Sequence, residues 1–318
     1  MRIGVDLGGT KIEAIALDEG NVERYRRRVP TPKGDYEGTV EAIAGLVRDI
    51  EKTLGVKGPV GVGTPGALSP ATGLLKNSNS TVLIGKPLDR DLSERLGRPV
   101  RLANDANCFA LSEARDGAAA GARTVFGVIL GTGVGGGIVV DGHVLTGPNA
   151  VAGEWGHNPL PWPKDDERPG PSCYCARSGC IETFLSGPAL ERDPSIEKYE
   201  ERLARALAGV INLLDPDVIV LGGGVSNIER LYGNVPKLWS RWIFSDEAGT
   251  KLLRAKHGAE NCRAVVRATP SDRCRGAVFR CADKSLREDH RPCLESRFQE
   301  FSRPACDDIH QRMSSAKR

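Results

Sequence analysis

Apolar residues recur at two spacings along the first 258 residues, and each spacing predicts its own kind of element. A spacing of three and four residues puts apolar side chains on one face of a helix, whereas short apolar runs that end in glycine are typical of buried strands. The predicted strands are 1–9, 11–17, 60–63, 100–103, 124–130, 137–140 and 217–221, and the predicted helices are 39–54, 88–96, 106–120 and 196–214. This alternation indicates an α/β fold.

One unit of this pattern, a strand, a glycine turn and a second strand, occurs twice, about 124 residues apart. The first copy pairs residues 1–9 with an antiparallel strand at 11–17. The repeat predicts two similar domains that face one another, at residues 1–118 and 119–258.

Three glycine clusters follow predicted strands: Asp6-Leu-Gly-Gly-Thr-Lys11, Gly131–Gly137 and Gly222–Gly224. Glycine lets backbone N–H groups approach phosphate oxygens, and Thr10 and Lys11 add a hydroxyl and a charge. None of the clusters is a P-loop or a Rossmann fingerprint. A tight β-turn would explain each cluster alone. Three clusters at strand ends, one of them carrying Asp6, favour a clamp for nucleotide phosphates.

A carboxylate lies where the strand at 100–103 meets the helix that begins at Ala106. The simplest interpretation is that Asn104 or Asp105 caps that helix. A helix N-terminus also stabilises an ionised carboxylate, and phosphoryl transfer needs one carboxylate to accept the proton of the attacking hydroxyl. Beside a phosphate clamp, we interpret Asp105 as that catalytic base.

His157 is followed by Cys173, Cys175 and Cys180, with the spacing His-x15-Cys-x-Cys-x4-Cys. One imidazole and three thiolates complete a tetrahedral shell, which is typical of structural zinc. Free thiols or a disulfide are the alternatives, but a bridge across Cys-x-Cys is strained. We therefore predict a zinc clip beside the proline-rich stretch 159–171, with Cys108 as a buried small side chain.

Charge and cysteine content are uneven along the chain. Of 318 residues, 44 are Lys or Arg and 41 are Asp or Glu, which gives a net charge of +3. Residues 259–318 hold 13 basic and 9 acidic residues together with five of the nine cysteines, so residues 1–258 have a net charge of −1. This charge is too weak to predict nucleic-acid binding, and the length argues against a small disulfide-rich secreted protein. We expect residues 259–318 to be poorly ordered.

The chain has no apolar run of about 18 residues, so no membrane helix is predicted. The start, Met-Arg-Ile-Gly-Val-Asp, does not resemble a signal peptide. We therefore expect a cytoplasmic protein that makes no contact with membranes.

The glycine clusters resemble the sugar kinase, Hsp70 and actin superfamily. That resemblance implies two ribonuclease-H-like domains around a cleft that binds ATP, Mg2+ and a sugar. Asp6 would lie near the metal through water, and Gly222–Gly224 would contact adenosine. The implied nucleotide-binding residues are Asp6, Gly8, Gly9, Thr10, Lys11, Gly131, Thr132, Gly133, Gly135, Gly222, Gly223 and Gly224.

Glu-x-Gly-His at 154–157, the cysteine cluster and Asp-x-Gly-Gly-Thr-Lys together resemble the ROK family (repressor, open reading frame, kinase). The stretches 104–108, 154–162, 179–184 and 214–224 are similar to its bacterial manno/fructokinase branch. This implies ATP-dependent phosphorylation of D-fructose at the 6-hydroxyl, with Asp105 as general base. The implied sugar contacts are Gly66, through its backbone, and Asn79, Asn104, Glu154, His157 and Glu182.

In this resemblance His157 uses one ring nitrogen for zinc and the other for the sugar. Without the resemblance, Asn79 would be a turn residue and Glu182 an acid in the first turn of a helix. The family also implies a homodimer and a small-molecule hexose as partner.

Two segments depart from the family pattern. About two dozen residues with helical character are absent between Leu190 and Ile196, and the sequence after Gly258 lacks the expected closing helix. We hypothesise that the coding sequence shifts frame near residue 259. Alternatives are another ROK hexose kinase (glucose, mannose, N-acetylmannosamine or N-acetylglucosamine), a sugar-responsive regulator, and a catalytically impaired sugar-binding protein. The regulator is disfavoured because no helix-turn-helix segment precedes residue 2.

Overall fold

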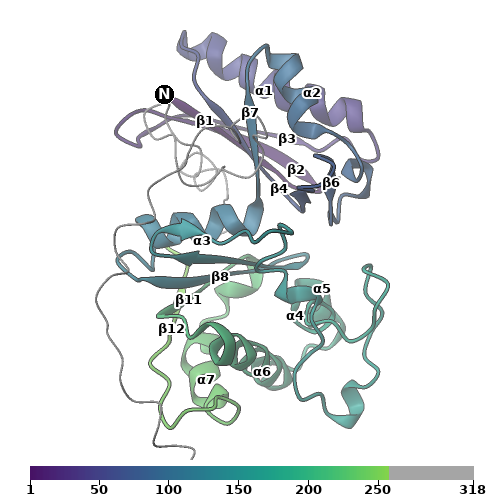
Figure 1. Ribbon diagram of the computed structural model, residues 1–318, viewed down its shortest axis with the longest axis vertical. Helices are drawn as coiled ribbons and strands as arrows, with labels where there is room; N and C mark the ends of the chain where they lie inside the picture. The colour runs from purple at the N-terminus through teal and green to yellow at the C-terminus, as the bar shows by residue number, and fades with distance from the viewer. Residues whose placement is uncertain (258–318) are drawn as a thin grey trace, which may run out of the picture. The chain divides into compact units, whose positions relative to one another are not determined.

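The computed structural model describes residues 1–257, all of which belong to one compact unit. Two five-stranded sheets organise this part of the chain, as Figure 1 shows. The predicted poor order of residues 259–318 and the proposed frame shift lie outside the described residues.

The first sheet has the strand order β3-β2-β1-β4-β7. The first three strands are antiparallel, and β4 and β7 run parallel to β1. Its strands are β1 (Arg2–Leu7), β2 (Lys11–Leu17), β3 (Glu23–Pro30), β4 (Val60–Thr64) and β7 (Val100–Asn104). A separate two-stranded sheet holds β5 (Ala67–Leu68) and β6 (Leu75–Lys76).

The second sheet repeats this order as β10-β9-β8-β11-β12, again with three antiparallel strands followed by two parallel ones. Its strands are β8 (Thr124–Leu130), β9 (Val134–Val140), β10 (His143–Val144), β11 (Val218–Gly222) and β12 (Lys251–Arg254). The predicted pair of similar α/β halves is therefore confirmed as a fold class.

Helices cover both sheets. They are α1 (Tyr36–Leu54), α2 (Leu88–Leu96), α3 (Asp105–Arg115), α4 (Glu182–Leu185), α5 (Gly187–Arg192), α6 (Ile196–Leu214) and α7 (Arg230–Trp239). In α1 the Asp35 side chain accepts a hydrogen bond from Gly38 N at 2.9 Å, and Gly55 ends the helix with a φ of 65°. A side-chain cap and a left-handed glycine are favourable start and stop signals, so the helix extends three residues before its predicted start.

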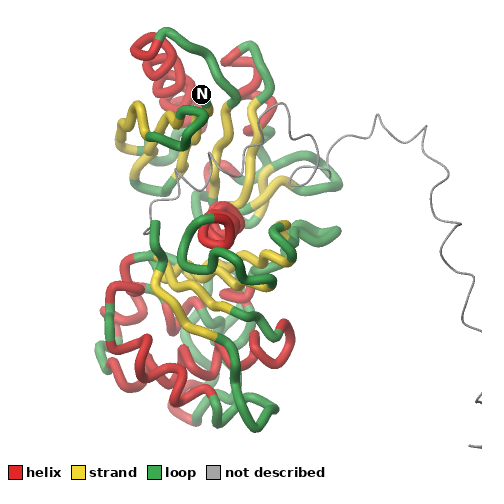
Figure 2. Tube along the Cα trace, turned by 90° about the vertical axis from the view of Figure 1, so that its left-hand side faces the viewer, coloured by secondary structure: helices red, strands yellow, loops and turns green. Residues whose placement is uncertain are grey.

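The helix α3 packs on the second sheet, although it follows the last strand of the first (Figures 1 and 2). Glycine permits this close approach, because a Cβ on Gly127 would lie 2.7 Å from the Cβ of Ala110 and one on Gly137 would lie 2.4 Å from Ala106 O. The domain boundary after residue 118 stays a prediction; α3 ends before it, at Arg115, yet packs on the second sheet.

The far end of α3 holds the end of β12. The buried Glu113 carboxylate accepts hydrogen bonds from Lys256 N at 3.1 Å, His257 N at 3.0 Å and Ala118 N at 2.7 Å. The segment after β12 is thus fixed to the helix that begins at Asp105.

The helices α6 and α7 lie on the face of the second sheet opposite α3 (Figure 1). The short connection between α5 and α6 is fully built into this layer. Ser195 caps α6 by accepting from Lys198 N, and Asp193 accepts a hydrogen bond from Arg202 Nη1 at 2.8 Å. This connection is therefore held to α6 by one helix cap and one ion pair.

Candidate active site

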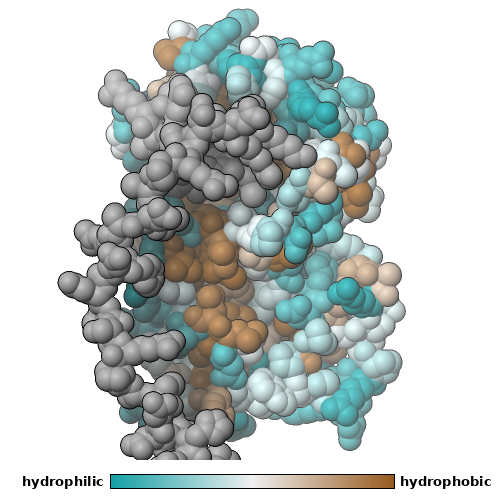
Figure 3. Space-filling view, in the orientation of Figure 1, coloured by the Kyte–Doolittle hydropathy of each residue, from teal (hydrophilic) through white to brown (hydrophobic). Residues whose placement is uncertain are grey.

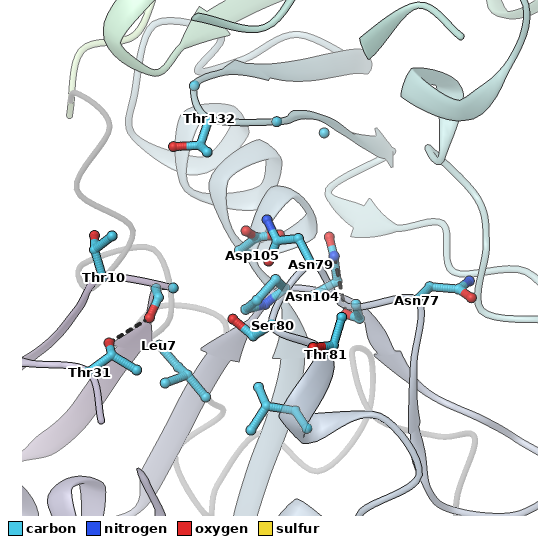
Figure 4. A pocket seen from close by; sticks show the side chains of 18 of the residues that line it. Leu7, Thr10, Thr31, Asn77, Asn79, Ser80, Thr81, Asn104, Asp105 and Thr132 are labelled. Atoms are coloured by element: carbon cyan, nitrogen blue, oxygen red, sulfur yellow. Dashed lines mark hydrogen bonds between the residues drawn. The ribbon is translucent and has the colours of Figure 1, made fainter. Parts of the chain in front are cut away.

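A pocket of about 620 Å³ is lined by residues of both halves. Side chains of Thr10, Asn79, Asn104, Asp105 and Thr132 gather around it in Figure 4. They come from the turn after β1, the loop before α2, the β7–α3 junction and the turn after β8. The predicted strand ends therefore do meet at one site.

Asn104, rather than Asp105, is the cap of α3. Its side-chain oxygen accepts from Asn107 N at 3.0 Å, and its amide nitrogen donates to Gly66 O at 3.2 Å. The Asp105 carboxylate accepts a hydrogen bond from the adjacent Ala106 N at 2.8 Å, and the Asn104 side chain also contributes one to it. Because Asn104 satisfies the helix end, the Asp105 carboxylate remains available to a ligand in the pocket.

The carboxyl groups of Asp105 and Asp6, both in the pocket lining, have raised pKa values. Burial, with the charge of Glu154 in addition, raises the pKa of Asp105 to about 6, although a hydrogen bond from Ala106 N opposes the shift. Burial and the charges of Asp105 and Glu13 raise the pKa of Asp6 to about 7. Such clusters of perturbed acids are typical of functional sites.

The two glycine turns lie at the pocket wall. In the first, Gly8 N donates to Lys11 O at 3.0 Å, and the Thr31 hydroxyl donates to Gly8 O at 2.7 Å. In the second, Glu182 accepts from Val134 N at 2.9 Å, and a Cβ on Gly133 would lie 2.7 Å from the same carboxylate. Glu182 thus joins the second glycine turn to the segment that carries the cysteines.

Most predicted ligand-binding residues line this pocket. They are Asp6, Gly8, Gly9, Thr10, Gly66, Asn79, Asn104, Asp105, Gly131, Thr132, Gly133, Gly135, Glu154, His157 and Glu182. The predicted residues that are not part of its lining are Lys11, Gly222, Gly223 and Gly224, together with the three cysteines.

Packing alone accounts for two glycines of the third cluster. A Cβ on Gly222 would lie 2.6 Å from the Phe109 ring, and Gly223 has a φ of 87° and no room beside Leu130 O. Only Gly224 faces open space. The adenosine contact assigned to this cluster stays a prediction.

Polar side chains gather at the end of the pocket near the cysteines. Glu154 precedes a short 3-10 helix, Trp155–His157, and burial raises its pKa while His157 opposes this. Tyr174 lies there too, and its pKa is raised by burial and by the charges of Glu182 and Glu154. Carboxylates, an imidazole and a phenol together suit a polyhydroxylated ligand.

The four predicted zinc ligands converge. One ligand atom from each of His157, Cys173, Cys175 and Cys180 lies within 4.8 Å of all the others. His157 Nδ1 is 3.5 Å from Cys173 Sγ, and the Sγ atoms of Cys175 and Cys180 are 3.6 Å apart. Zn–S bonds of about 2.3 Å give tetrahedral edges of about 3.8 Å. The donor set and its spacing fit a zinc ion, and the thiols are free rather than bridged.

A buried ionic network fixes the proline-rich stretch to α6. Glu167 accepts from Arg202 and Arg205, both at 2.8 Å, and Arg205 also donates to Trp162 O at 2.5 Å. These arginines hold the pKa of Glu167 at about 2 against the effect of burial. Removing one partner would leave a buried charge unpaired, so the network specifies the path of this segment.

Sequence reasoning missed several pocket residues. Thr31, Ser80 and Thr81 line the pocket from loops without a recognisable motif, and Tyr174 was treated only as a spacer between two cysteines. The sequence does contain one indication of Tyr174. If Cys173 and Cys175 bind the same ion, the side chain between them must face away from that ion.

Outside the pocket, the surface is mostly hydrophilic on the face seen in Figure 3, and apolar side chains gather in a strip at the level of the second sheet. Within residues 1–257, no helix combines the length and apolar character needed to span a membrane.

The ROK family profile matches residues 2–198 and 193–264 of this chain. The N-acetyl-D-glucosamine kinase of Photobacterium profundum is 39% identical over 288 positions, which cover 81% of this chain and 95% of that protein. Since 81% of 318 residues is about 258, the relative carries about 30 positions without a counterpart here. The two profile matches meet at residues 193–198, where the shortened connection was expected.

Two solved structures are similar over most of the chain. A ROK hexokinase from Thermus thermophilus is 35% identical, with a TM-score of 0.70, over 83% of this chain and 96% of that one. A ROK glucokinase from Streptomyces griseus, solved with glucose and AMPPNP, is 29% identical, with a TM-score of 0.70, over 84% and 98%.

The names of the curated relatives do not support the expectation of fructose as the preferred sugar, because they are N-acetyl-D-glucosamine kinases. The family itself is shown by the profile match, by the identity and by the shared fold. This chain belongs to the ROK family.

Proposed function

We propose that this protein is an ATP-dependent sugar kinase that transfers the γ-phosphoryl group of ATP to the 6-hydroxyl of a hexose. One observation carries the proposal: Asp105 lies in a single pocket with both glycine turns and with polar groups suited to sugar hydroxyls. The sugar kinases among the relatives and similar structures support the same class.

Asp105 is the proposed general base. A base is most effective when its pKa lies near the working pH, and the pKa of about 6 leaves Asp105 mostly ionised at neutral pH while it still takes up a proton. It would accept the proton of the 6-hydroxyl as that oxygen attacks the γ-phosphorus.

The turns at Gly8–Thr10 and Gly131–Gly133 are the proposed phosphate cradle, since both turns line the pocket that holds Asp105. Bound Mg2+ supplies neutralisation of phosphate charge, and Asp6 is the carboxylate that would stand near it. Contacts of Lys11 and of Gly222–Gly224 with ATP remain predictions.

The remaining polar groups are the proposed sugar contacts: Gly66, Asn79, Asn104, Glu154, His157 and Glu182. Zinc on His157 and the three cysteines would fix the segment that carries this end of the pocket. A structural ion of this kind contributes to folding rather than to the chemical step.

N-acetyl-D-glucosamine is the leading substrate, because the curated relatives bear that name. Fructose is the second candidate, favoured by the resemblance of residues 154–162 and 179–184 to the manno/fructokinase branch. Fructose is a ketohexose and N-acetylglucosamine an acetylated aldohexose, but both offer hydroxyls to the same polar groups, so these shared contacts do not separate them.

A coupled ADP-release assay with Mg-ATP tests the proposal. The panel is N-acetylglucosamine, fructose, glucose, mannose and N-acetylmannosamine, and the product is identified as the 6-phosphate by NMR. The highest kcat/KM is expected for N-acetylglucosamine. Lack of turnover with every sugar, together with retained sugar binding in calorimetry, would favour the impaired sugar-binding protein.

A chimaera with a family-type segment after residue 258 shows whether the atypical tail limits activity. Equal activity and equal melting temperature would rule out an effect of the tail. The predicted homodimer is checked on the same samples by light scattering.

A further inference from the structure

Tyr174 occupies an unusual place, between two cysteines that turn toward the metal cluster while its own side chain lines the pocket. Its hydroxyl lies 2.9 Å from His157 Nε2, and the two rings meet edge to face with centroids 5.0 Å apart. Despite this contact, 57% of the residue is exposed. The phenol is therefore held in position and still accessible to a ligand.

A zinc ion held by the cluster would fix the proton arrangement of this pair. His157 Nδ1 faces Cys173 Sγ at 3.5 Å, on the side where the metal ligands converge. A nitrogen that ligates a metal carries no proton, so the proton of a neutral imidazole is on Nε2. Nε2–H then donates to the Tyr174 oxygen, and the phenol proton is left for another acceptor.

The neighbouring groups make this donor distinctive. Glu154 and Glu182 also line this end of the pocket, and ionised carboxylates only accept hydrogen bonds. The Asn104 amide nitrogen is engaged with Gly66 O. The Tyr174 hydroxyl is thus a hydrogen-bond donor beside two carboxylate acceptors. It lies at His157 Nε2, the ring nitrogen that, by the family resemblance, contacts the sugar.

We propose that Tyr174 is a specificity-determining sugar contact, whose hydroxyl is oriented by His157 and donates to one oxygen of the hexose. This inference rests on the proposed function. In it, His157 positions Tyr174, and the sugar meets the phenol at this end of the pocket rather than the imidazole alone.

The test is Tyr174→Phe, which keeps the ring and its packing and removes only the hydroxyl. The loss of one hydrogen bond is expected to raise the sugar KM about 3- to 10-fold. The kcat and the KM for ATP should stay within about two-fold, because neither Asp105 nor the glycine turns change. Zinc content and melting temperature are measured to show that the cluster still forms.

Tyr25→Phe is the matched control, since its hydroxyl donates to Asp49 at 2.6 Å and Tyr25 is not part of the pocket lining. It should leave the sugar KM unchanged. Deoxy analogues of the accepted sugar then identify the partner oxygen. The analogue that lacks this oxygen should bind wild type and Tyr174→Phe equally, while the other analogues retain the difference.

The outcomes separate the two proposals. If wild type phosphorylates or binds a sugar and Tyr174→Phe leaves KM and Kd within two-fold for all sugars, the role of Tyr174 is overturned and the kinase assignment stands. If wild type binds no hexose in calorimetry with or without a nonhydrolysable ATP analogue, both are overturned.

Discussion

The two sheets have one strand order, yet their strand ends bring different chemistry to the pocket. Asp6, next to last in β1, pairs with Gly63 of the neighbouring parallel strand. Ile129, next to last in β8, pairs in the same way with Gly222. Both side chains line the pocket. The repeated scaffold therefore brings a glycine turn to the pocket from each half, but an acid at this strand position from the first half only.

The ends of the fifth strands differ in the same sense. β7 leads directly into Asn104 and Asp105, whereas β12 leads into backbone that Glu113 holds. A single base suffices for phosphoryl transfer. The two halves thus share one strand order, and the residues that follow their fifth strands differ.

The largest expected effect follows from Asp105→Asn, which removes the proposed general base at the end of β7 in the first half. Turnover should fall by about 10²- to 10⁴-fold, the typical contribution of a general base. Sugar binding should persist, because Asn104 still caps α3. The ADP-release assay and calorimetry measure the two. Asp141→Asn, at a surface pair with Arg123, is the control, and activity retained by Asp105→Asn would refute the assignment.

Cys175→Ser tests a feature that only the second half has, the predicted zinc cluster of His157 and three cysteines. Loss of one ligand should abolish zinc retention and weaken sugar affinity by about 10- to 100-fold. ATP affinity should change little, since the glycine turns do not contact the cysteines. Zinc content and calorimetry are the measurements. The control is Cys108→Ala on α3, which should keep its zinc. If zinc-free Cys175→Ser bound sugar as tightly as wild type, the proposed role of the zinc cluster would be contradicted.

The pH dependence of kcat/KM reports on the acids at the first half's strand ends. Activity should rise about tenfold per pH unit below 6 and level off above about 7, because Asp105 acts as a base only when ionised. Asp6 and Asp105 interact, so the apparent pKa values belong to the pair.

Stability should have the opposite trend. Both pKa values are raised in the folded state, which therefore holds protons that the unfolded state has lost between pH 3.8 and about 7. The contribution of these acids to the free energy of unfolding falls as the pH rises through that window. Thermal unfolding of Asp105→Asn should show a weaker fall than wild type, and an identical pH profile would exclude the raised pKa.

The smallest expected effect comes from Glu113→Gln, which weakens the tie between the two halves. The neutral amide replaces a carboxylate that accepts from three backbone N–H groups, so the free energy of unfolding should drop by about 1–3 kcal/mol. Chemical denaturation measures it, with the exposed Glu37→Gln as control. A stability equal to wild type would show that β12 needs no such anchor.

Periodicity predicted the elements whose burial is regular. Residues 11–17, 88–96, 124–130 and 196–214 have the predicted limits. The half-exposed strand β3, with three consecutive arginines, has no apolar alternation and was not predicted. The predicted helix 106–120 ends at Arg115, and beyond it Ala118 N donates to the Glu113 side chain and Ala119 N to Glu113 O instead of continuing the helical bonds.

The site was predictable to the extent that it depends on motifs next to strand ends. Asp105 and the glycine turns follow strands directly, so their convergence follows from sheet topology. Whether Asn104 or Asp105 caps α3 was open in the sequence, because both side chains suit that position. The hydrogen bond of Asn104 to Gly66 O resolves it, and this contact joins residues 38 positions apart.

The short α5–α6 connection has a practical consequence. Asp193 and Ser195 tie this connection to α6 with one ion pair and one helix cap. Lengthening a loop costs little entropy when its ends already meet. The bond between Asp193 and Pro194 is therefore a suitable point at which to insert a reporter domain or to open new termini while the kinase pocket stays intact.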